Sequence, residues 1–263
     1  MKIKAKKSLG QNFLIDKEIL EQIVNIGNIS NNSEVLEIGP GTGNLTEYIL
    51  KKKPKKILVI EKDNNLSSLL NEKFNNQIVI INDDVLKISE NSLSKKKLIV
   101  FGNLPYNIST EILSKWIINL DTNVWFSKLL LMFQKEVADR IIAKPNTSNY
   151  GRLSILSDWK LNIKKIIDIK PNSFSPKPKV DSSLLMFSPK ESFFEIKNPK
   201  SIETITRIFF NQRRKKIKKP FKQIFDNPEE VSKKLNIDLN LRPQNLSSKT
   251  YFEITKEYEN LRG

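Results

Sequence analysis

Four consecutive residues, Asn103-Leu104-Pro105-Tyr106, combine groups that could hold and activate an amine. They offer a side-chain amide, backbone carbonyls that Pro105 helps to fix, and one aromatic face. An exocyclic amine on an aromatic base is a poor nucleophile because its lone pair is delocalised into the ring. Acceptors around its N–H bonds could bend it out of conjugation while an aromatic ring holds the base flat, which is chemistry by positioning and electrostatics. A plain strand-to-helix turn is the alternative.

A second group of residues has the composition of a nucleoside site. The segment from Glu37 to Gly43 contains Gly39 and Gly41, and glycines let a backbone turn tightly and approach a ligand. Glu61 follows the next apolar run, about where a carboxylate reaches ribose hydroxyls. A dinucleotide-binding dehydrogenase is the natural alternative. Glu37 before the loop and Asp84 after the third strand favour an S-adenosylmethionine site, with Asp84 accepting from the adenine amino group. A helix cap is the other interpretation of Asp84.

The composition excludes several mechanisms. The chain has no cysteine and no histidine, so we expect no disulfide, thiol nucleophile, imidazole base or metal site. No segment approaches the roughly 18 uncharged apolar residues of a membrane span, and the N-terminus lacks the apolar stretch of a signal peptide. We therefore expect a cytoplasmic protein without membrane contact. The net charge of +16 favours a polyanionic partner such as nucleic acid, although a lysine bias in an AT-rich genome is an alternative source of the charge.

Short apolar runs that alternate with helical patterns predict the scaffold behind these groups. We expect strands at 34–38, 56–60, 78–81, 98–101, 126–133, 163–169 and 183–187, and helices at 16–29, 44–52, 109–119 and 134–143. Gly102 marks the expected end of the fourth strand. The alternation indicates an α/β fold with a doubly wound sheet and ligands at the carboxyl ends of its strands, and the last two runs suggest an antiparallel edge hairpin. We expect a catalytic domain at 1–190 and a small all-α domain at 191–263.

Several motifs in one chain resemble those of the ribosomal-RNA adenine dimethyltransferases. They lie at residues 7–14, 37–43, 103–109, 134–137, 150–154 and 174–182, in the order that the family has. Residues 103–109 and 209–216 are similar to the branch that acts on small-subunit RNA. The erythromycin-resistance methylases of the large-subunit RNA more often have isoleucine at the position of Leu104. Lys177 departs from the family, which often has proline there.

The resemblance implies a Rossmann-like, S-adenosylmethionine-dependent methyltransferase. Its substrate would be two adjacent adenosines near the 3′ end of small-subunit (16S) ribosomal RNA, in a pre-ribosomal small subunit, and its product N6,N6-dimethyladenosine. By matching position, the cofactor site should be lined by Gln11, Asn12, Leu14, Gly39, Glu61, Asp84 and Asn103, with Gly41 of the glycine loop. The catalytic residues should be Asn103, Leu104, Pro105, Tyr106 and Phe174. Tyr106 and Phe174 should sandwich the target base. Phe174 could instead belong to the core, but its loop setting argues against burial in regular structure.

A basic tract in the expected C-terminal helical domain predicts the surface that binds RNA. Its six cations are Arg213, Arg214, Lys215, Lys216, Lys218 and Lys219, interrupted only by Ile217. The tract suits phosphate contacts, and an ordinary solvated helix face is the alternative. We expect a monomer. Methylation of large-subunit RNA or DNA, and a non-catalytic role as an assembly factor or transcription-factor relative, remain open alternatives at this stage.

Overall fold

The computed structural model of this chain describes Lys6 and residues 10–262. The beginning of the motif at 7–14 and most of the N-terminal lysines therefore lie outside the described residues. Between Gly10 and Arg262, no helix is both long and apolar enough to cross a membrane.

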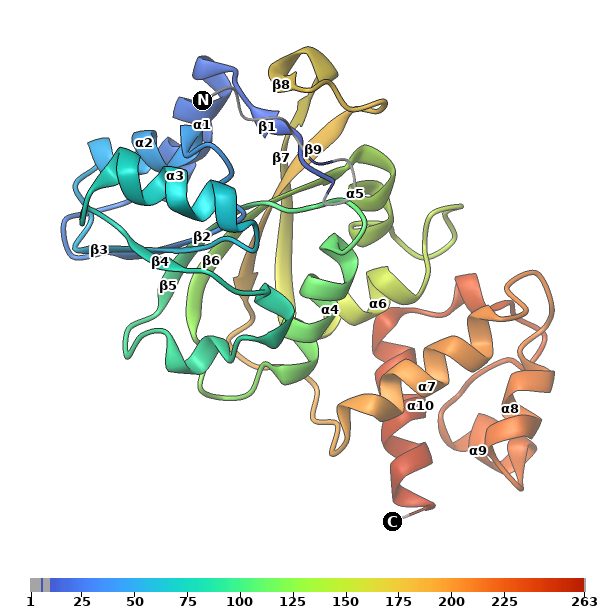
Figure 1. The fold of residues 1–263 in the computed structure, drawn as a ribbon. Helices are drawn as coiled ribbons and strands as arrows, with labels where there is room; N and C mark the ends of the chain where they lie inside the picture. Colours follow the sequence, from blue (N-terminus) through green and yellow to red (C-terminus); the bar gives the residue numbers. More distant parts are fainter. Residues whose placement is uncertain (1–5, 7–9, 263) are drawn as a thin grey trace. The chain divides into compact units, whose positions relative to one another are not determined.

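A seven-stranded sheet in the order β4-β3-β2-β5-β6-β9-β7 forms the centre of the first unit (Figure 1). Its strands are β2 (Glu34–Ile38), β3 (Lys56–Ile60), β4 (Val79–Ile81), β5 (Leu98–Asn103), β6 (Phe126–Gln134), β7 (Leu161–Ile169) and β9 (Ser182–Pro189). The pairs from β4 to β6 are parallel, and β9 runs antiparallel to β6. The central strands are buried nearly throughout, as expected of parallel strands covered on both faces. The predicted doubly wound sheet is confirmed, with β9 and β7 at one edge.

Helices surround this sheet where the sequence has an apolar helical face. They are α1 (Lys17–Gly27), α2 (Asn44–Lys51), α3 (Asn64–Phe74), α4 (Ser109–Asn119) and α5 (Lys135–Ile141). Helix α1 begins as predicted, because the Asp16 side chain accepts from the N–H of Ile19, and its buried face includes Leu20 and Ile23. Helices α1 to α3 lie together on one side of the sheet (Figure 1).

A small antiparallel sheet joins two segments that are far apart in the sequence. Strand β1 (Phe13–Leu14) pairs with β8 (Phe174–Ser175), and Leu14 lies opposite Phe174. This pairing holds the start of the described chain beside the loop that precedes β9.

Strand β5 does not end where the sequence suggested. Gly102 and Asn103 continue the strand, because they pair with Leu131 and Met132 of β6. The expected end at Gly102 is therefore wrong, and Asn103 is the last residue of the strand. Short 3₁₀ turns lie at η2 (Val85–Lys87) and η3 (Glu90–Ser92) before β5, and at η4 (Pro171–Ser173) and η5 (Pro243–Asn245) after it.

The chain divides into two compact units. The first contains the residues up to Lys115 together with Asp121–Ala138 and Ile163–Pro189. The second contains Trp116–Leu120, Asp139–Asn162 and the residues from Lys190 onward. Its helices are α6 (Arg152–Lys160), α7 (Pro199–Phe210), α8 (Lys218–Ile224), α9 (Pro228–Lys234) and α10 (Ser248–Asn260). Among the residues that the structure describes after Pro189, the regular elements are helices, as predicted. The assignment of catalysis to residues 1–190 and of RNA binding to 191–263 stays a prediction.

Candidate active site

A cavity of about 200 Å³ opens at the carboxyl ends of β2, β3 and β5. Its walls come from the segment at 10–13, the glycine loop, the ends of β3 and β4, and the segment at 103–108. Parallel strands end at the same edge of a sheet, so residues from distant parts of the sequence meet there. The cavity brings together Gln11, Asn12, Gly39, Gly41, Glu61, Asp84 and Asn103 with Leu104, Pro105 and Tyr106.

Gly41 is a position of the loop where a side chain would clash with a neighbour. Its φ is +59°, in the left-handed region, and a Cβ there would lie 2.6 Å from the Phe13 ring. Gly39 also has a positive φ, but a Cβ would meet only the Asn103 carbonyl oxygen at 3.6 Å. The absence of a side chain at Gly41 lets Phe13 pack directly over the loop.

Glu61 lies at the carboxyl end of β3 and is 7% exposed. Its carboxylate accepts from the backbone N–H of Asp63 at 2.9 Å and from that of Gly41 at 3.2 Å. Burial raises the pKa of Glu61, and these two hydrogen bonds oppose the rise. The residue therefore ties the glycine loop to the start of α3 and offers acceptor oxygens at the cavity wall.

Glu37 lies behind the glycine loop and is not among the residues that line the cavity. Its side chain is 2% exposed and accepts from the Thr46 hydroxyl at 2.7 Å. Burial, opposed by this hydrogen bond, raises the pKa of Glu37 to about 7. This carboxyl group braces the loop against α2.

Asp84 combines the two roles that its sequence position suggested. One carboxylate oxygen accepts from the N–H of Leu86 at 3.0 Å and caps η2, while the residue also lines the cavity. The other oxygen accepts from Lys62 Nζ at 2.8 Å. The hydrogen bond from Lys62, with that from Leu86, holds the pKa of Asp84 below its usual range. Asp84 is therefore an ionised acceptor at neutral pH.

The Asn103 amide is held in one orientation. Its Nδ2 donates to the Asn12 carbonyl oxygen at 2.6 Å, which leaves Oδ1 as the acceptor atom. Reversing the amide would set two oxygens against each other, so the hydrogen bond selects the orientation. Asn103 lines the cavity, and an acceptor there is what an incoming amine requires.

Tyr106 is half-buried at the cavity, and its hydroxyl lies 2.5 Å from Ser182 Oγ at the start of β9. Burial raises the pKa of Tyr106, so the phenol stays neutral at physiological pH. Ser182 is fully buried. The hydroxyl contact fixes the far end of a ring that lines the cavity.

Residues 2–260 match the family model described as ribosomal RNA adenine dimethylase. The chain belongs to the ribosomal RNA adenine dimethylase family. A protein of Pelagibacter ubique (strain HTCC1062) named ribosomal RNA small subunit methyltransferase A is 70% identical over 263 residues, the whole of both chains. A protein of the same name from Ehrlichia ruminantium (strain Gardel) is 45% identical over 257 residues, 96% of each chain.

Two solved structures of methyltransferases are similar to this chain over almost its whole length. A dimethyladenosine transferase from Plasmodium falciparum has a TM-score of 0.78 and 27% identity, over 94% of this chain and 98% of that one. The 23S rRNA methyltransferase ErmE has a TM-score of 0.69 and 20% identity, over 94% of this chain and 100% of the other, which is a likeness of fold. The chain is an adenine dimethyltransferase with a Rossmann-like fold.

The cofactor of this dimethylase is S-adenosylmethionine, and the cavity fits it. When bound, it supplies a methyl group activated by a sulfonium. Glu61 and Asp84 provide acceptors for hydroxyl and amino groups, and apolar side chains suit a flat ring. The apolar lining residues include Ile38, Ile60, Leu66 and Val85.

Two predicted site residues of the dimethylase lie elsewhere. Phe174 is in β8, 1% exposed and part of the core, so the expectation that its loop keeps it out of buried regular structure is wrong. The pairing with Leu14 explains the burial, because β1 covers the segment. Leu14 is itself a core residue beside a smaller neighbouring cavity, and its carbonyl oxygen accepts from Asn44 Nδ2 at 2.8 Å. Contact of Leu14 with cofactor and of Phe174 with the base stay predictions.

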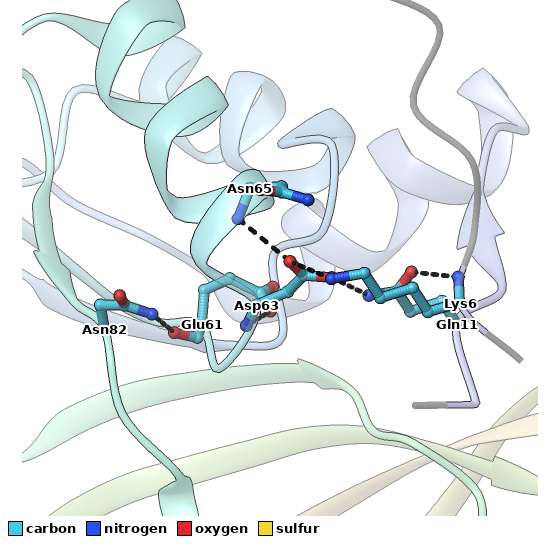
Figure 2. A network of polar contacts seen from close by, with 6 residues as sticks. All are labelled: Lys6, Gln11, Glu61, Asp63, Asn65 and Asn82. Atoms are coloured by element: carbon cyan, nitrogen blue, oxygen red, sulfur yellow. Dashed lines mark hydrogen bonds and ion pairs between the residues drawn. The ribbon is translucent and has the colours of Figure 1, made fainter. Parts of the chain in front are cut away.

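Sequence reasoning missed Asp63. This residue is 4% exposed and accepts hydrogen bonds from Lys6, Gln11 and Asn65 (Figure 2). An aspartate directly before the helical pattern at 64–74 is a helix-start signal, which could have indicated a cap. Its contacts with Lys6 and Gln11 depend on the fold and have no local signature.

The basic tract of the dimethylase begins after α7 and ends in the first turn of α8, in the second unit. Lys215, Lys216, Lys218 and Lys219 are exposed, as is Arg214. Arg213 is half-buried, and its Nη2 donates to the Thr147 carbonyl oxygen at 3.0 Å. Ile217 is fully buried and anchors the tract. Most of these cations are therefore placed to meet a polyanion, and their contact with RNA stays a prediction.

Proposed function

We propose that this protein converts two adjacent adenosines near the 3′ end of small-subunit ribosomal RNA to N6,N6-dimethyladenosine. The relatives named above are small-subunit methyltransferases, which supports this substrate over large-subunit RNA or DNA. We place the reaction in the cytoplasm, on a pre-ribosomal small subunit, with the protein acting as a monomer. The observation that carries the proposal is the Asn103 amide, whose orientation leaves Oδ1 at the cavity as an acceptor.

The chain's own residues would activate the adenine amine by position. Asn103 Oδ1 and a backbone carbonyl of the adjoining turn accept from the two N–H bonds and draw the nitrogen lone pair out of conjugation. Tyr106, whose ring is steadied by Ser182, stacks on the base and keeps it in the plane that this geometry needs. After the nitrogen has gained a methyl group, its proton is held by Asn103 Oδ1 and passes to water. No strong base is required.

The residues that we expect to hold the cofactor include Gln11, Asn12, Gly39, Gly41, Glu61 and Asp84. Glu61 would accept from ribose hydroxyls and Asp84 from the adenine amino group. Calorimetry with S-adenosylmethionine and with NAD separates this site from a dehydrogenase site. We expect binding of S-adenosylmethionine alone, and binding of NAD alone would overturn the assignment.

Profiling of modified adenosines in ribosomes from a deletion strain tests the RNA substrate. We expect N6,N6-dimethyladenosine to disappear from the small-subunit RNA and to return when the gene is restored. Loss of a modification from large-subunit RNA instead would favour methylation of that RNA, the alternative that is suggested by the name of the 23S rRNA methyltransferase ErmE, which shares the fold. Unchanged modification in both RNAs would leave a non-catalytic assembly role as the better proposal.

A further inference from the structure

One buried side chain connects the N-terminal segment to the cavity wall. Asp63 precedes α3, and its side chain is 2% exposed. Its Oδ1 accepts from the N–H of Asn65 at 3.0 Å and from Lys6 Nζ at 2.9 Å, and its Oδ2 accepts from Gln11 Nε2 at 3.1 Å (Figure 2). Because the carboxylate is shielded from water, each of these hydrogen bonds has more effect than an exposed one.

The Gln11 amide is used by the protein at both ends. Its Nε2 donates to Asp63, and its Oε1 accepts from the N–H of Lys6 at 2.7 Å. Figure 2 shows the Gln11 and Lys6 side chains converging on Asp63. A reversed amide would face donor with donor at Lys6 and acceptor with acceptor at Asp63. The two hydrogen bonds of the amide therefore fix the orientation of the Gln11 side chain at the cavity.

Asp63 also acts on a second lining residue of the cavity through its backbone. Its N–H donates to Glu61 Oε1 at 2.9 Å, while Glu61 Oε2 accepts from Gly41. Asp63 itself is not among the residues that line the cavity. It thus touches two residues that we expect at the cofactor, Gln11 and Glu61, without reaching the cofactor space.

The charge of Asp63 has a counter-ion on the N-terminal segment. Lys6 is exposed at 45% of its side chain, and its Nζ lies on the nearly buried carboxylate. Burial acts to raise the pKa of Asp63, but the hydrogen bonds from Lys6 and Gln11 outweigh it and leave the pKa below its usual value. The carboxylate is therefore ionised at neutral pH, and an ionised carboxylate holds the Gln11 amide more firmly than a neutral group would.

We propose that Asp63 is a positioning residue that sets cofactor affinity through its side chain, which holds Gln11 in place at the cavity. This inference rests on the proposed function, because it takes the cavity to be the S-adenosylmethionine site. The effect falls on binding and not on methyl transfer, since the Asn103 amide is oriented by a separate hydrogen bond to Asn12.

The variant Asp63→Asn tests the inference with little change in shape. It keeps an oxygen for the Asn65 N–H and places an amide donor against Gln11 Nε2. We expect the Kd for S-adenosylmethionine, measured by calorimetry, to rise about 10-fold. The KM for the cofactor should rise in parallel, while kcat at saturating cofactor should change less than about 2-fold.

Asp16→Asn is the matched control. Asp16 caps α1, a helix of the same 11-residue length as α3, and accepts from the N–H of Ile19 without lining the cavity. It should leave the Kd for S-adenosylmethionine unchanged. Far-UV circular dichroism and urea midpoints of both variants should show the folded state.

A reciprocal exchange separates positioning from general destabilisation. In Asp63→Asn combined with Gln11→Glu, the new amide donates to the new carboxylate, which still accepts from the Lys6 N–H. We expect the Kd to return to within about 3-fold of the wild-type value. Gln11→Glu alone sets two carboxylates together and should raise the Kd, which keeps the test decisive if Asp63→Asn does not fold.

Two results would overturn the inference. One is an unchanged Kd in both single variants, and the other is a raised Kd that the reciprocal exchange fails to restore. Absence of S-adenosylmethionine binding by the wild-type protein is a different outcome, which would contradict the cofactor assignment of the proposed function.

Discussion

The hydrogen bond between Asn103 and Asn12 shows how the chemistry depends on the orientation of a single amide. The last residue of β5 donates through Nδ2 to the Asn12 carbonyl oxygen at 2.6 Å, and this bond decides which atom remains to accept from an amine. A shape-conserving substitution can therefore remove the function without emptying the site.

The first prediction concerns Asn103→Asp. The new carboxylate has no donor for the Asn12 carbonyl, and two oxygens would repel at a separation that now holds a hydrogen bond. We expect the single-turnover rate of methyl transfer to fall on the order of 100-fold or more, as for removal of a group that stabilises the transition state. Asn71→Asp on the exposed side of α3 is the control for the added charge. Wild-type turnover by folded Asn103→Asp would refute the role.

The second prediction concerns the pH dependence of stability. Glu37 has a pKa of about 7 in the folded protein against an ordinary value of 4.5. Because the pKa is higher in the folded state, the protonated Glu37 carboxyl stabilises the folded protein. This contribution to the free energy of unfolding is complete below pH 4.5 and is lost as the pH rises through about 7. The shift corresponds to about 3 kcal/mol.

Glu37→Gln removes this titration and keeps an acceptor for the Thr46 hydroxyl. Between about pH 4.5 and 7.5 we expect the free energy of unfolding of the wild type to fall by about 2–3 kcal/mol more than that of the variant. Urea unfolding at both pH values measures the difference. Parallel stability curves for the two proteins would show that Glu37 titrates normally.

Among the elements, the β2–α2 loop and the β1 segment are packed against each other at Gly41 and Phe13. The third prediction compares Gly41→Ala with Gly39→Ala. Both positions have a positive φ, but only at Gly41 would the added Cβ meet an aromatic ring, at 2.6 Å. Gly39→Ala should cost about 1 kcal/mol of backbone strain, and Gly41→Ala about 1–3 kcal/mol more from overpacking.

The same clash should weaken cofactor binding in Gly41→Ala, because Phe13 follows the Asn12 carbonyl that orients Asn103. Thermal unfolding and calorimetry of the two variants check both parts. Equal loss of stability in the two variants would mean that Phe13 moves aside freely.

Strands and helices with strong apolar patterns were predictable from the sequence. Strands β2 and β3 have the expected bounds because each is one short apolar run between turn residues. Helix α6 is buried on most of its surface, so its sequence has no periodic contrast to reveal it. The exact end of β5 depends on pairing with β6, and the glycine at 102 gave a misleading local signal.

The positions of the site residues were predictable where those residues belong to sequence motifs. They were less predictable where burial of a residue depends on the fold. The cavity collects Glu61, Asp84 and Asn103 because they end neighbouring parallel strands. Phe174 is a core residue through its pairing with a segment near the N-terminus, and Asp63 meets Lys6 and Gln11 across 57 and 52 residues of sequence. No local pattern contains such partners.

For the whole molecule, we expect the net charge of +16 to affect RNA binding most where exposed cations lie close together. The basic tract in the second unit provides such a place, and it contributes nothing to the lining of the cavity at the sheet. RNA affinity and cofactor affinity should therefore respond to different substitutions.

The fourth prediction replaces four of the five exposed cations of the tract, Arg214, Lys215, Lys218 and Lys219, with glutamine. Arg213 is left in place because it holds the Thr147 carbonyl. Binding to the small subunit should weaken, and its salt dependence should flatten by roughly 0.7–0.9 for each RNA phosphate that the variant no longer neutralises. Affinity across a salt series, with calorimetry for the cofactor, gives the result.

The control makes the same change of charge at the exposed lysines 51, 52, 53 and 55 of the first unit. It should have the smaller effect on the salt slope, since those lysines lie around the end of α2. An unchanged slope in the first variant would mean that the basic tract is only a solvated surface and that RNA binds elsewhere.

The most direct test of the central claim is to incubate the protein with labelled S-adenosylmethionine and undermethylated small subunits, and then to map the labelled bases. We predict label in N6,N6-dimethyladenosine at two adjacent adenosines near the 3′ end of the small-subunit RNA, and almost none with folded Asn103→Ala. Label elsewhere, no label with the wild-type protein, or equal labelling by Asn103→Ala would contradict the account.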